Sequence, residues 1–156
     1  MMRIFVDGDA MPIVVRNILF RAAERTRIPL VLVANQPIHT PRSDYITCIT
    51  VPAGPDEADD RIVEMAQAGD LVITADIPLA DRAIGKRAIV IDPRGALYTS
   101  ENIKEKLSLR DLMDELRGCG IDTGGPSAFC SSDCQAFANQ LDRLLTKYLR
   151  NSTGDV

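Results

Sequence analysis

The chain has 156 residues, of which 46% are hydrophobic and 26% are charged, and its formal net charge is -4. This length and apolar fraction suit one compact domain. The negative net charge provides no global positive field for nucleic acid, so any nucleic-acid partner must bind a local patch.

Short runs rich in Val and Ile alternate with segments of helical periodicity. They predict buried strands with amphipathic helices between them. The strands are expected at residues 4–6, 30–34, 46–51, 71–74 and 88–91, and the helices at 12–25, 56–68 and 77–84. Alternation of this kind indicates the α/β class: a doubly wound, mostly parallel five-stranded sheet with helices on both faces.

The pattern becomes helical after the fifth strand. We expect helices at 101–107 and 109–117, with Ser100 and Ser108 as N-caps, and a final helix after the Gly-, Ser- and Thr-rich stretch 118–132. Residues 1–150 should form a single domain, and 151–156 should be a disordered tail.

The cysteines and the apolar segments bear on cellular location. No pair of cysteines has the C-x-x-C spacing of a zinc or redox motif, which favours reduced thiols. The first apolar run is too short for a signal sequence, and no stretch approaches the ~18 apolar residues of a membrane span. We therefore expect a cytoplasmic protein without a membrane partner. The cysteines are Cys48, Cys119, Cys130 and Cys134.

Acidic residues follow three of the predicted strands, at the edge where doubly wound sheets bind ligands. Asp7 and Asp9 follow the first strand, Asp76 follows the fourth and Asp92 follows the fifth. An alternative is that Asp9 and Asp76 cap the helices that come next. Capping does not account for Asp7, which ends a buried strand, so we predict that carboxylates gather at this edge.

Asp59 joins this set through its place on a predicted helix. It precedes Ile62 and Val63 at helical spacing and should therefore share their apolar face. An unpaired carboxylate there must pair with a cation, bind metal or become protonated. Oxygen ligands without neighbouring His or Cys favour Mg²⁺ or Mn²⁺, and such a site suits hydrolysis at phosphorus. The predicted metal ligands are Asp7, Asp9, Asp59 and Asp76.

Several motifs in fixed order resemble the YaiI/YqxD family of uncharacterised bacterial proteins. They are Val6-Asp7-Gly8-Asp9-Ala10-Met11-Pro12, Leu32-Val33-Ala34-Asn35-Gln36, Asp56 to Asp59 with Ile62-Val63, Asp70 to Ala80, Pro93-Arg94-Gly95 and Thr123-Gly124-Gly125-Pro126.

That family is similar to the PIN domain, a doubly wound fold whose better-studied members are metal-dependent ribonucleases. By position, the resemblance implies that Asp7, Asp59 and Asp76 are catalytic, with Asp9 or Asp81 as a fourth acid. Met11 stands where the family usually has a cysteine, so no catalytic thiol is expected beside the acids.

Polar side chains in two other loops are candidates for substrate binding. Asn35 and Gln36 follow the second strand, and Arg94 follows the fifth. They can donate hydrogen bonds to phosphate or to base edges. The alternative for Arg94 is an ion pair with Asp92, and we interpret His39 as a surface residue.

Three functions compete. We favour a divalent-metal-dependent nuclease that hydrolyses phosphodiesters, with RNA as the expected substrate. A phosphatase of the haloacid-dehalogenase type also uses an Asp-x-Asp turn after its first strand, but Ala10-Met11-Pro12 lacks the usual hydroxyl residue. The third is a non-catalytic binding protein that a metal stabilises. The sequence leaves the oligomeric state open.

Overall fold

The computed structural model describes residues 2–54, 56–120 and 129–154, and it contains one six-stranded sheet with the order β3-β2-β1-β4-β5-β6. The first five strands are parallel to their neighbours, and β6 runs antiparallel to β5. The strands are β1 (Ile4–Asp7), β2 (Leu30–Ala34), β3 (Ile46–Thr50), β4 (Leu71–Ile73), β5 (Ile89–Ile91) and β6 (Leu97–Tyr98).

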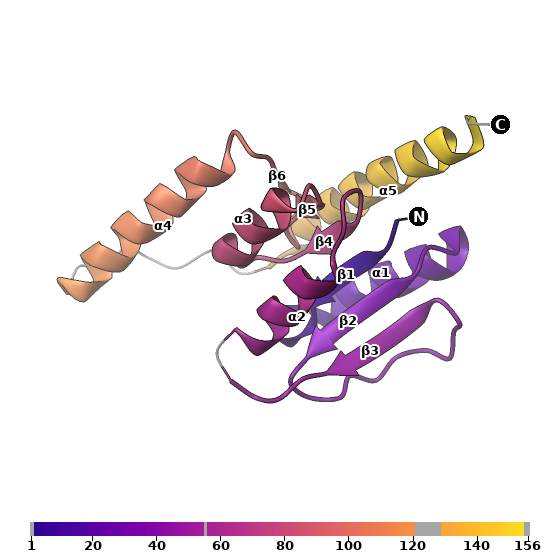
Figure 1. Ribbon diagram of the computed structural model, residues 1–156, viewed down its shortest axis with the longest axis horizontal. Helices are drawn as coiled ribbons and strands as arrows, with labels where there is room; N and C mark the ends of the chain where they lie inside the picture. The colour runs from indigo at the N-terminus through magenta and orange to yellow at the C-terminus, as the bar shows by residue number, and fades with distance from the viewer. Residues whose placement is uncertain (1, 55, 121–128, 155–156) are drawn as a thin grey trace.

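Helices cover both faces of the sheet (Figure 1). One face packs against α1 and α5, and the other packs against α2, α3 and the start of α4. Side chains alternate between the two faces along a strand, so Ile4 and Val6 join one core while Phe5 joins the other. The helices are α1 (Ile13–Thr26), α2 (Glu57–Met65), α3 (Ile77–Gly85), α4 (Ile103–Gly118) and α5 (Ser131–Gly154), with a short 3-10 turn, η1 (Gly8–Ala10).

The strand order places a topological switch point between β1 and β4. From β1 the chain continues to β2 and β3 on one side, and it then crosses back to β4 on the other side of β1. Helices on opposite sides leave an open crevice beyond the carboxyl ends of such neighbouring strands, which is where doubly wound sheets bind ligands.

The α/β fold with a mostly parallel sheet is confirmed, and three details differ from expectation. A sixth strand, β6, pairs with β5. The two helices expected on either side of Ser108 form one continuous helix, α4, whose N-cap is Asn102 instead of Ser100. The last helix, α5, continues to Gly154, beyond the expected domain end at residue 150. Residues 121–128, with the motif Thr123–Pro126, and 155–156 lie outside the described residues.

All four cysteines, at the positions named above, are free thiols, as expected. No helix in the described part of the chain is both long enough and apolar enough to cross a membrane.

Candidate functional site

Asp7 and Asp76 lie on the two sides of the switch point. Asp7 is the last residue of β1 and is half-buried. Asp76 is the N-cap of α3, and its Oδ1 accepts a hydrogen bond from the backbone N–H of Leu79 at 3.0 Å. The N–H of Asp76 donates to the Oγ1 of Thr74, which is fully buried. The capping interpretation of Asp76 is therefore confirmed. The hydrogen bonds of Asp76 with Thr74 and Leu79 hold its carboxylate beside the end of β4.

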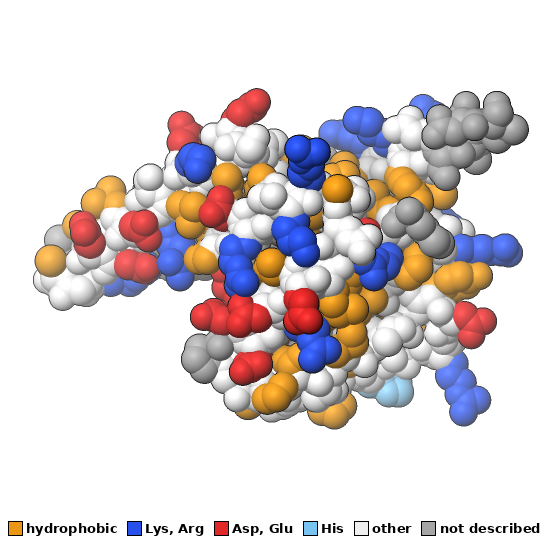
Figure 2. All heavy atoms as spheres, in the orientation of Figure 1, with side chains coloured by type: hydrophobic (Ala, Val, Ile, Leu, Met, Phe, Trp, Pro, Cys, Tyr) orange, Lys and Arg blue, Asp and Glu red, His pale blue; other side chains and the backbone are white. Residues whose placement is uncertain are grey.

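Asp59 approaches the same place from α2. It is half-buried, whereas its neighbours Asp56 and Asp60 are exposed. Asp60 forms a surface ion pair with Arg82 at 2.8 Å. The pKa of Asp59 is raised to about 6, first by burial and then by the charges of Asp76, Asp7 and Asp56 and a hydrogen bond with Asp76. On the face seen in Figure 2, acidic side chains gather over α2.

Asp7 is affected by the same crowding. Its pKa is raised to about 6, first by burial and then by the charges of Asp9 and Asp76, while a hydrogen bond from the backbone N–H of Asp9 opposes the rise. We call Asp7, Asp59 and Asp76 the acidic cluster. In the described part of the chain, no Lys, Arg or His lies within ion-pair distance of these three carboxylates.

The cluster is not a closed cage of metal ligands. Among the described residues, no group of three or more His, Cys, Asp or Glu side chains is arranged so that it could hold a metal ion. The carboxylates lie within electrostatic range of one another, from a strand end and two helices, without forming a complete ligand set.

Asp9 has a different role from the one that capping predicts. Its side chain caps neither η1 nor α1. Instead both carboxylate oxygens accept the backbone N–H of Asn35, each at 3.0 Å. A Cβ at Gly8 would lie 2.6 Å from Cδ1 of Ile38, at the end of a side chain in the same loop. Asp9 thus ties the loop after β2 to the site.

The side chains of Asn35 and Gln36 are exposed in that loop, at the same edge of the sheet. His39 is also exposed, as expected of a surface residue. Asp81, the other candidate for a fourth acid, is half-buried on α3 and does not contribute to the raised pKa of Asp7 or Asp59.

Arg94 forms its ion pair with a residue other than Asp92. Its guanidinium lies 3.1 Å from Oδ2 of Asp133 and 5.9 Å from the ring centre of Phe129, while its backbone N–H donates to Asp92. Sequence reasoning missed Asp133. An acid three residues after the start of a helix is a capping signal, and the carboxylate of Asp133, three residues after Cys130, does accept the backbone N–H of Cys130. A cavity of about 400 Å³ is lined by Arg94 together with Ala75 and Asp92, which follow β4 and β5, and no member of the acidic cluster lines it.

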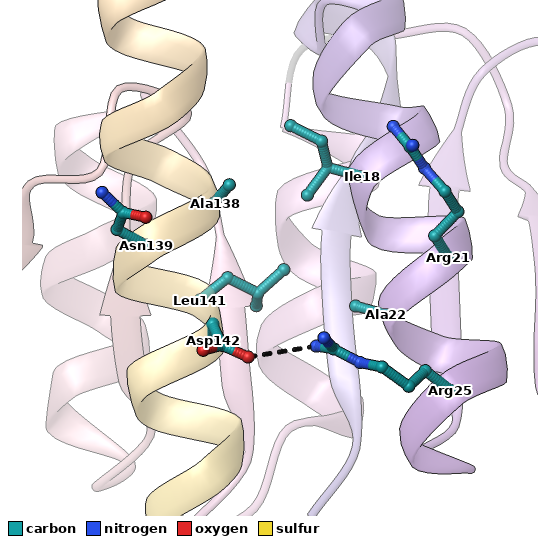
Figure 3. A pocket seen from close by; sticks show the side chains of 8 residues that line it. All are labelled: Ile18, Arg21, Ala22, Arg25, Ala138, Asn139, Leu141 and Asp142. Atoms are coloured by element: carbon teal, nitrogen blue, oxygen red, sulfur yellow. Dashed lines mark hydrogen bonds and ion pairs between the residues drawn. The ribbon is translucent and has the colours of Figure 1, made fainter.

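A separate hollow of about 620 Å³ lies between α1 and α5, on the opposite side from α2 and α3 (Figure 3). Ile18 and Leu141 form part of its apolar wall, and an ion pair between Arg25 and Asp142 spans it at 3.3 Å. No member of the acidic cluster lines this hollow.

Comparison with known proteins identifies the family of this chain but does not indicate an activity. Residues 5–147 match the family described as "Uncharacterized BCR, YaiI/YqxD family". A UPF0178 protein of Bordetella petrii is 58% identical over 92% of this chain and 96% of its own. One from Alkalilimnicola ehrlichii is 57% identical over 93% and 98%, and one from Shewanella woodyi is 54% identical over 94% and 97%. No solved structure gives a significant match.

Proposed function

This chain belongs to the YaiI/YqxD family, whose description names no activity, and from its own site we propose that it is a nuclease dependent on Mg²⁺ or Mn²⁺, with RNA as substrate. The observation that carries the proposal is the acidic cluster. Asp7, Asp59 and Asp76 come from three separate elements and meet beside the switch point, without a basic partner among the described residues. A divalent cation is the natural counter-ion for such a set.

We propose that one or two of these carboxylates bind a magnesium-like ion. Mg²⁺ is usually bound through one or two carboxylates and keeps several waters, so a complete protein cage is not required. In this proposal Asp7 and Asp76 contact the ion, and Asp59 acts directly or through water. A bound ion of this kind lowers the pKa of its water and stabilises the leaving oxygen in phosphodiester hydrolysis.

The remaining side chains position the substrate. Asn35 and Gln36 donate to phosphate or base edges from a loop that Asp9 holds in place. Arg94, oriented by Asp133, presents a cationic edge next to the cavity at the strand ends. The proposed location of the activity is the cytoplasm.

The test is cleavage of a fluorogenic RNA with Mn²⁺ or Mg²⁺ and with chelator. We expect metal-dependent cleavage that falls at least about 100-fold in Asp7→Asn and in Asp76→Asn. Asp60→Asn is the matched control, because Asp60 lies beside Asp59 on α2 but pairs with Arg82 at the surface. Equal cleavage by Asp7→Asn and the native chain would refute the proposal.

Two alternatives give different outcomes in companion assays. Calorimetric binding of Mn²⁺ without any RNA cleavage supports a non-catalytic, metal-stabilised binding protein. Turnover of small phosphomonoesters supports a phosphatase. In the phosphatase Asp9 would act as acid or base, whereas here both its oxygens are engaged by Asn35.

A further inference from the structure

Four hollows lie in a row from the strand ends to the C-terminal part of α5, because each shares a lining residue with the next. Phe129 lines the first hollow, which is the cavity of about 400 Å³ described above, and the second, of about 490 Å³. Arg21 lines the second and the third, which is the hollow of about 620 Å³ in Figure 3. Asp142 lines the third and the fourth, of about 430 Å³. We call the four together the α5 groove.

The α5 groove links the edge that carries the acidic cluster with the far end of α5. Ala75, which immediately precedes Asp76 in the chain, lines the first hollow. Residues of α5 between Ser131 and Asn151 line the other three in chain order, and α1 supplies the opposite wall of the second and third. At 1.5 Å per residue, this part of α5 spans about 30 Å. A ligand that occupies the whole groove is therefore elongated.

The charges that line the groove are mostly positive. Arg25 forms an ion pair with Asp142 at 3.3 Å. In contrast, Arg21, Arg143 and Lys147 are exposed and form no ion pair within the described residues. Figure 2 shows Lys and Arg side chains around the C-terminal part of α5. The lining cations are Arg21, Arg25, Arg94, Arg143, Lys147 and Arg150, and the lining acids are Asp92 and Asp142.

Helix stability does not explain the positions of Arg143 and Lys147. A cation stabilises a helix through its dipole only within the last turn, and α5 continues to Gly154, about two turns beyond Lys147. The two cations are also four residues apart, a spacing at which like charges destabilise a helix. An anionic partner outside the fold would remove this repulsion.

An elongated polyanion matches both the length and the charge of the groove. Proteins hold single-stranded nucleic acid in basic grooves that follow the phosphate backbone. A membrane surface fits less well, because a helix bound to lipid buries apolar side chains, whereas the described residues that line the fourth hollow are all polar. We propose that the α5 groove binds single-stranded RNA through its phosphates and leads it to the acidic cluster. The choice of RNA rests on the proposed function.

Binding should depend strongly on salt and little on base sequence. Contacts to phosphate carry no sequence information, and among the described residues aromatic side chains line only the first two hollows. A single strand loses about 0.7 in the slope of log affinity against log salt for each phosphate that is neutralised. The three unpaired cations therefore predict a slope of roughly −2. At about 3.4 Å per nucleotide, a strand of about nine nucleotides spans the groove along α5.

Fluorescence anisotropy of a labelled RNA of about 12 nucleotides in chelator tests the groove, because cleavage in this proposal needs a metal. We expect Arg143→Gln/Lys147→Gln to weaken binding at least about tenfold at low salt and to reduce the slope by about 1.4. Lys104→Gln is the control, because Lys104 is exposed on α4 and lines none of the four hollows. Thermal melts verify that each variant keeps the fold. No binding by the native chain, or equal binding by the double variant, would overturn the proposal.

Competition separates RNA from related ligands. An unlabelled single strand should displace the labelled RNA more effectively than a duplex of the same sequence or vesicles of phosphatidylglycerol and phosphatidylcholine. Equal competition by the duplex would overturn the assignment to single strands. Stronger competition by the vesicles would overturn RNA as the ligand and would indicate a membrane surface instead.

Cleavage with Mn²⁺ tests whether the groove leads to the acidic cluster. For an RNA of about 12 nucleotides, Arg143→Gln/Lys147→Gln should raise KM at least about fivefold and leave kcat unchanged, whereas an RNA of about four nucleotides is too short to reach these cations and should be cleaved equally by both proteins. An unchanged KM for the longer RNA would overturn the proposed path. Binding in chelator without cleavage in any metal would refute the nuclease alone, and cleavage without binding in the groove would refute the groove alone.

Discussion

Asp7→Asn should stabilise the metal-free protein at pH 7.5. The pKa of Asp7 is 3.8 in an ordinary environment and about 6 in the folded chain. The folded state therefore holds a proton that the unfolded state releases between these values, and stability falls as pH rises through this window. Above about pH 6 the whole free-energy cost of ionised Asp7 in the folded state is present. The side chain of Asn has the same shape and no charge, so Asp7→Asn removes this cost.

The size of the effect follows from the pKa difference. Two pH units correspond to about 3 kcal/mol, which we reduce to about 1 to 2 kcal/mol because the side chain is partly exposed to solvent. For a domain of this size that is a rise in Tm of about 3 to 6 °C. Thermal melts in chelator should show the rise at pH 7.5 and a smaller one at pH 4.5, where Asp7 is mostly protonated.

Metal should change which of the two proteins, the native chain or Asp7→Asn, has the higher Tm. Mg²⁺ or Mn²⁺ binds the native cluster and raises its Tm, whereas Asp7→Asn should respond less. Asp60→Asn, the surface control, should show neither the gain in chelator nor the loss of metal response, since Asp60 is already paired with Arg82. If Asp7→Asn lowers the Tm in chelator at pH 7.5, the three carboxylates are not crowded in the folded chain.

Three further substitutions test contacts around the site and the core. Asp76→Ala and Asp76→Asn both remove a charge that crowds Asp7 and Asp59, and both should lose the metal response. Asp76→Ala also loses the cap on α3 and should therefore be about 1 kcal/mol less stable than Asp76→Asn, which keeps an acceptor; urea melts with and without Mn²⁺ separate the two effects. Asp70→Asn should cost about 2 to 3 kcal/mol in the same melts, because its buried carboxylate binds Arg3 and accepts the N–H of Gln67, and an unchanged midpoint would contradict this. Gly95→Ala should cost more than about 2 kcal/mol, because φ is 91° and the new Cβ would lie 2.7 Å from the backbone of Ala136; retention of the native Tm would show that α5 can shift to make room.

The sequence predicted those features that depend on local pattern. Runs of Val and Ile gave the first five strands, and parallel strands bring their carboxyl ends to one edge, so Asp7 and Asp76 could be placed together without a structure. Helical spacing placed Asp59 on the inner side of α2, where it is half-buried as expected. Each of these inferences needed only the period of an element and the rule for where a doubly wound sheet binds ligands.

Features that depend on contacts between distant segments were missed. β6 is two residues long and has no periodicity to detect, although the turn before it, with Gly95 at positive φ, is a hairpin signal. Asp9 resembled a helix cap because its true partner, Asn35, lies in another loop. Arg94 pairs with Asp133 across 39 positions of sequence. Ser108 was predicted to be an N-cap, but α4 continues without a break from Ile103 to Gly118.

A buried carboxylate with a structural role has different surroundings in this chain from those of the acidic cluster. Asp70 is 2% exposed, and its two oxygens accept the N–H groups of Arg3 and Gln67 while the guanidinium of Arg3 lies 3.3 Å away. Buried charge is thus compensated by a cation and by backbone donors. Asp7 and Asp59 have no such cation in the described part of the chain and lie beside other acids instead. A fold that satisfies one buried carboxylate so completely and leaves two others crowded bears a cost in stability, and binding a divalent cation would offset that cost.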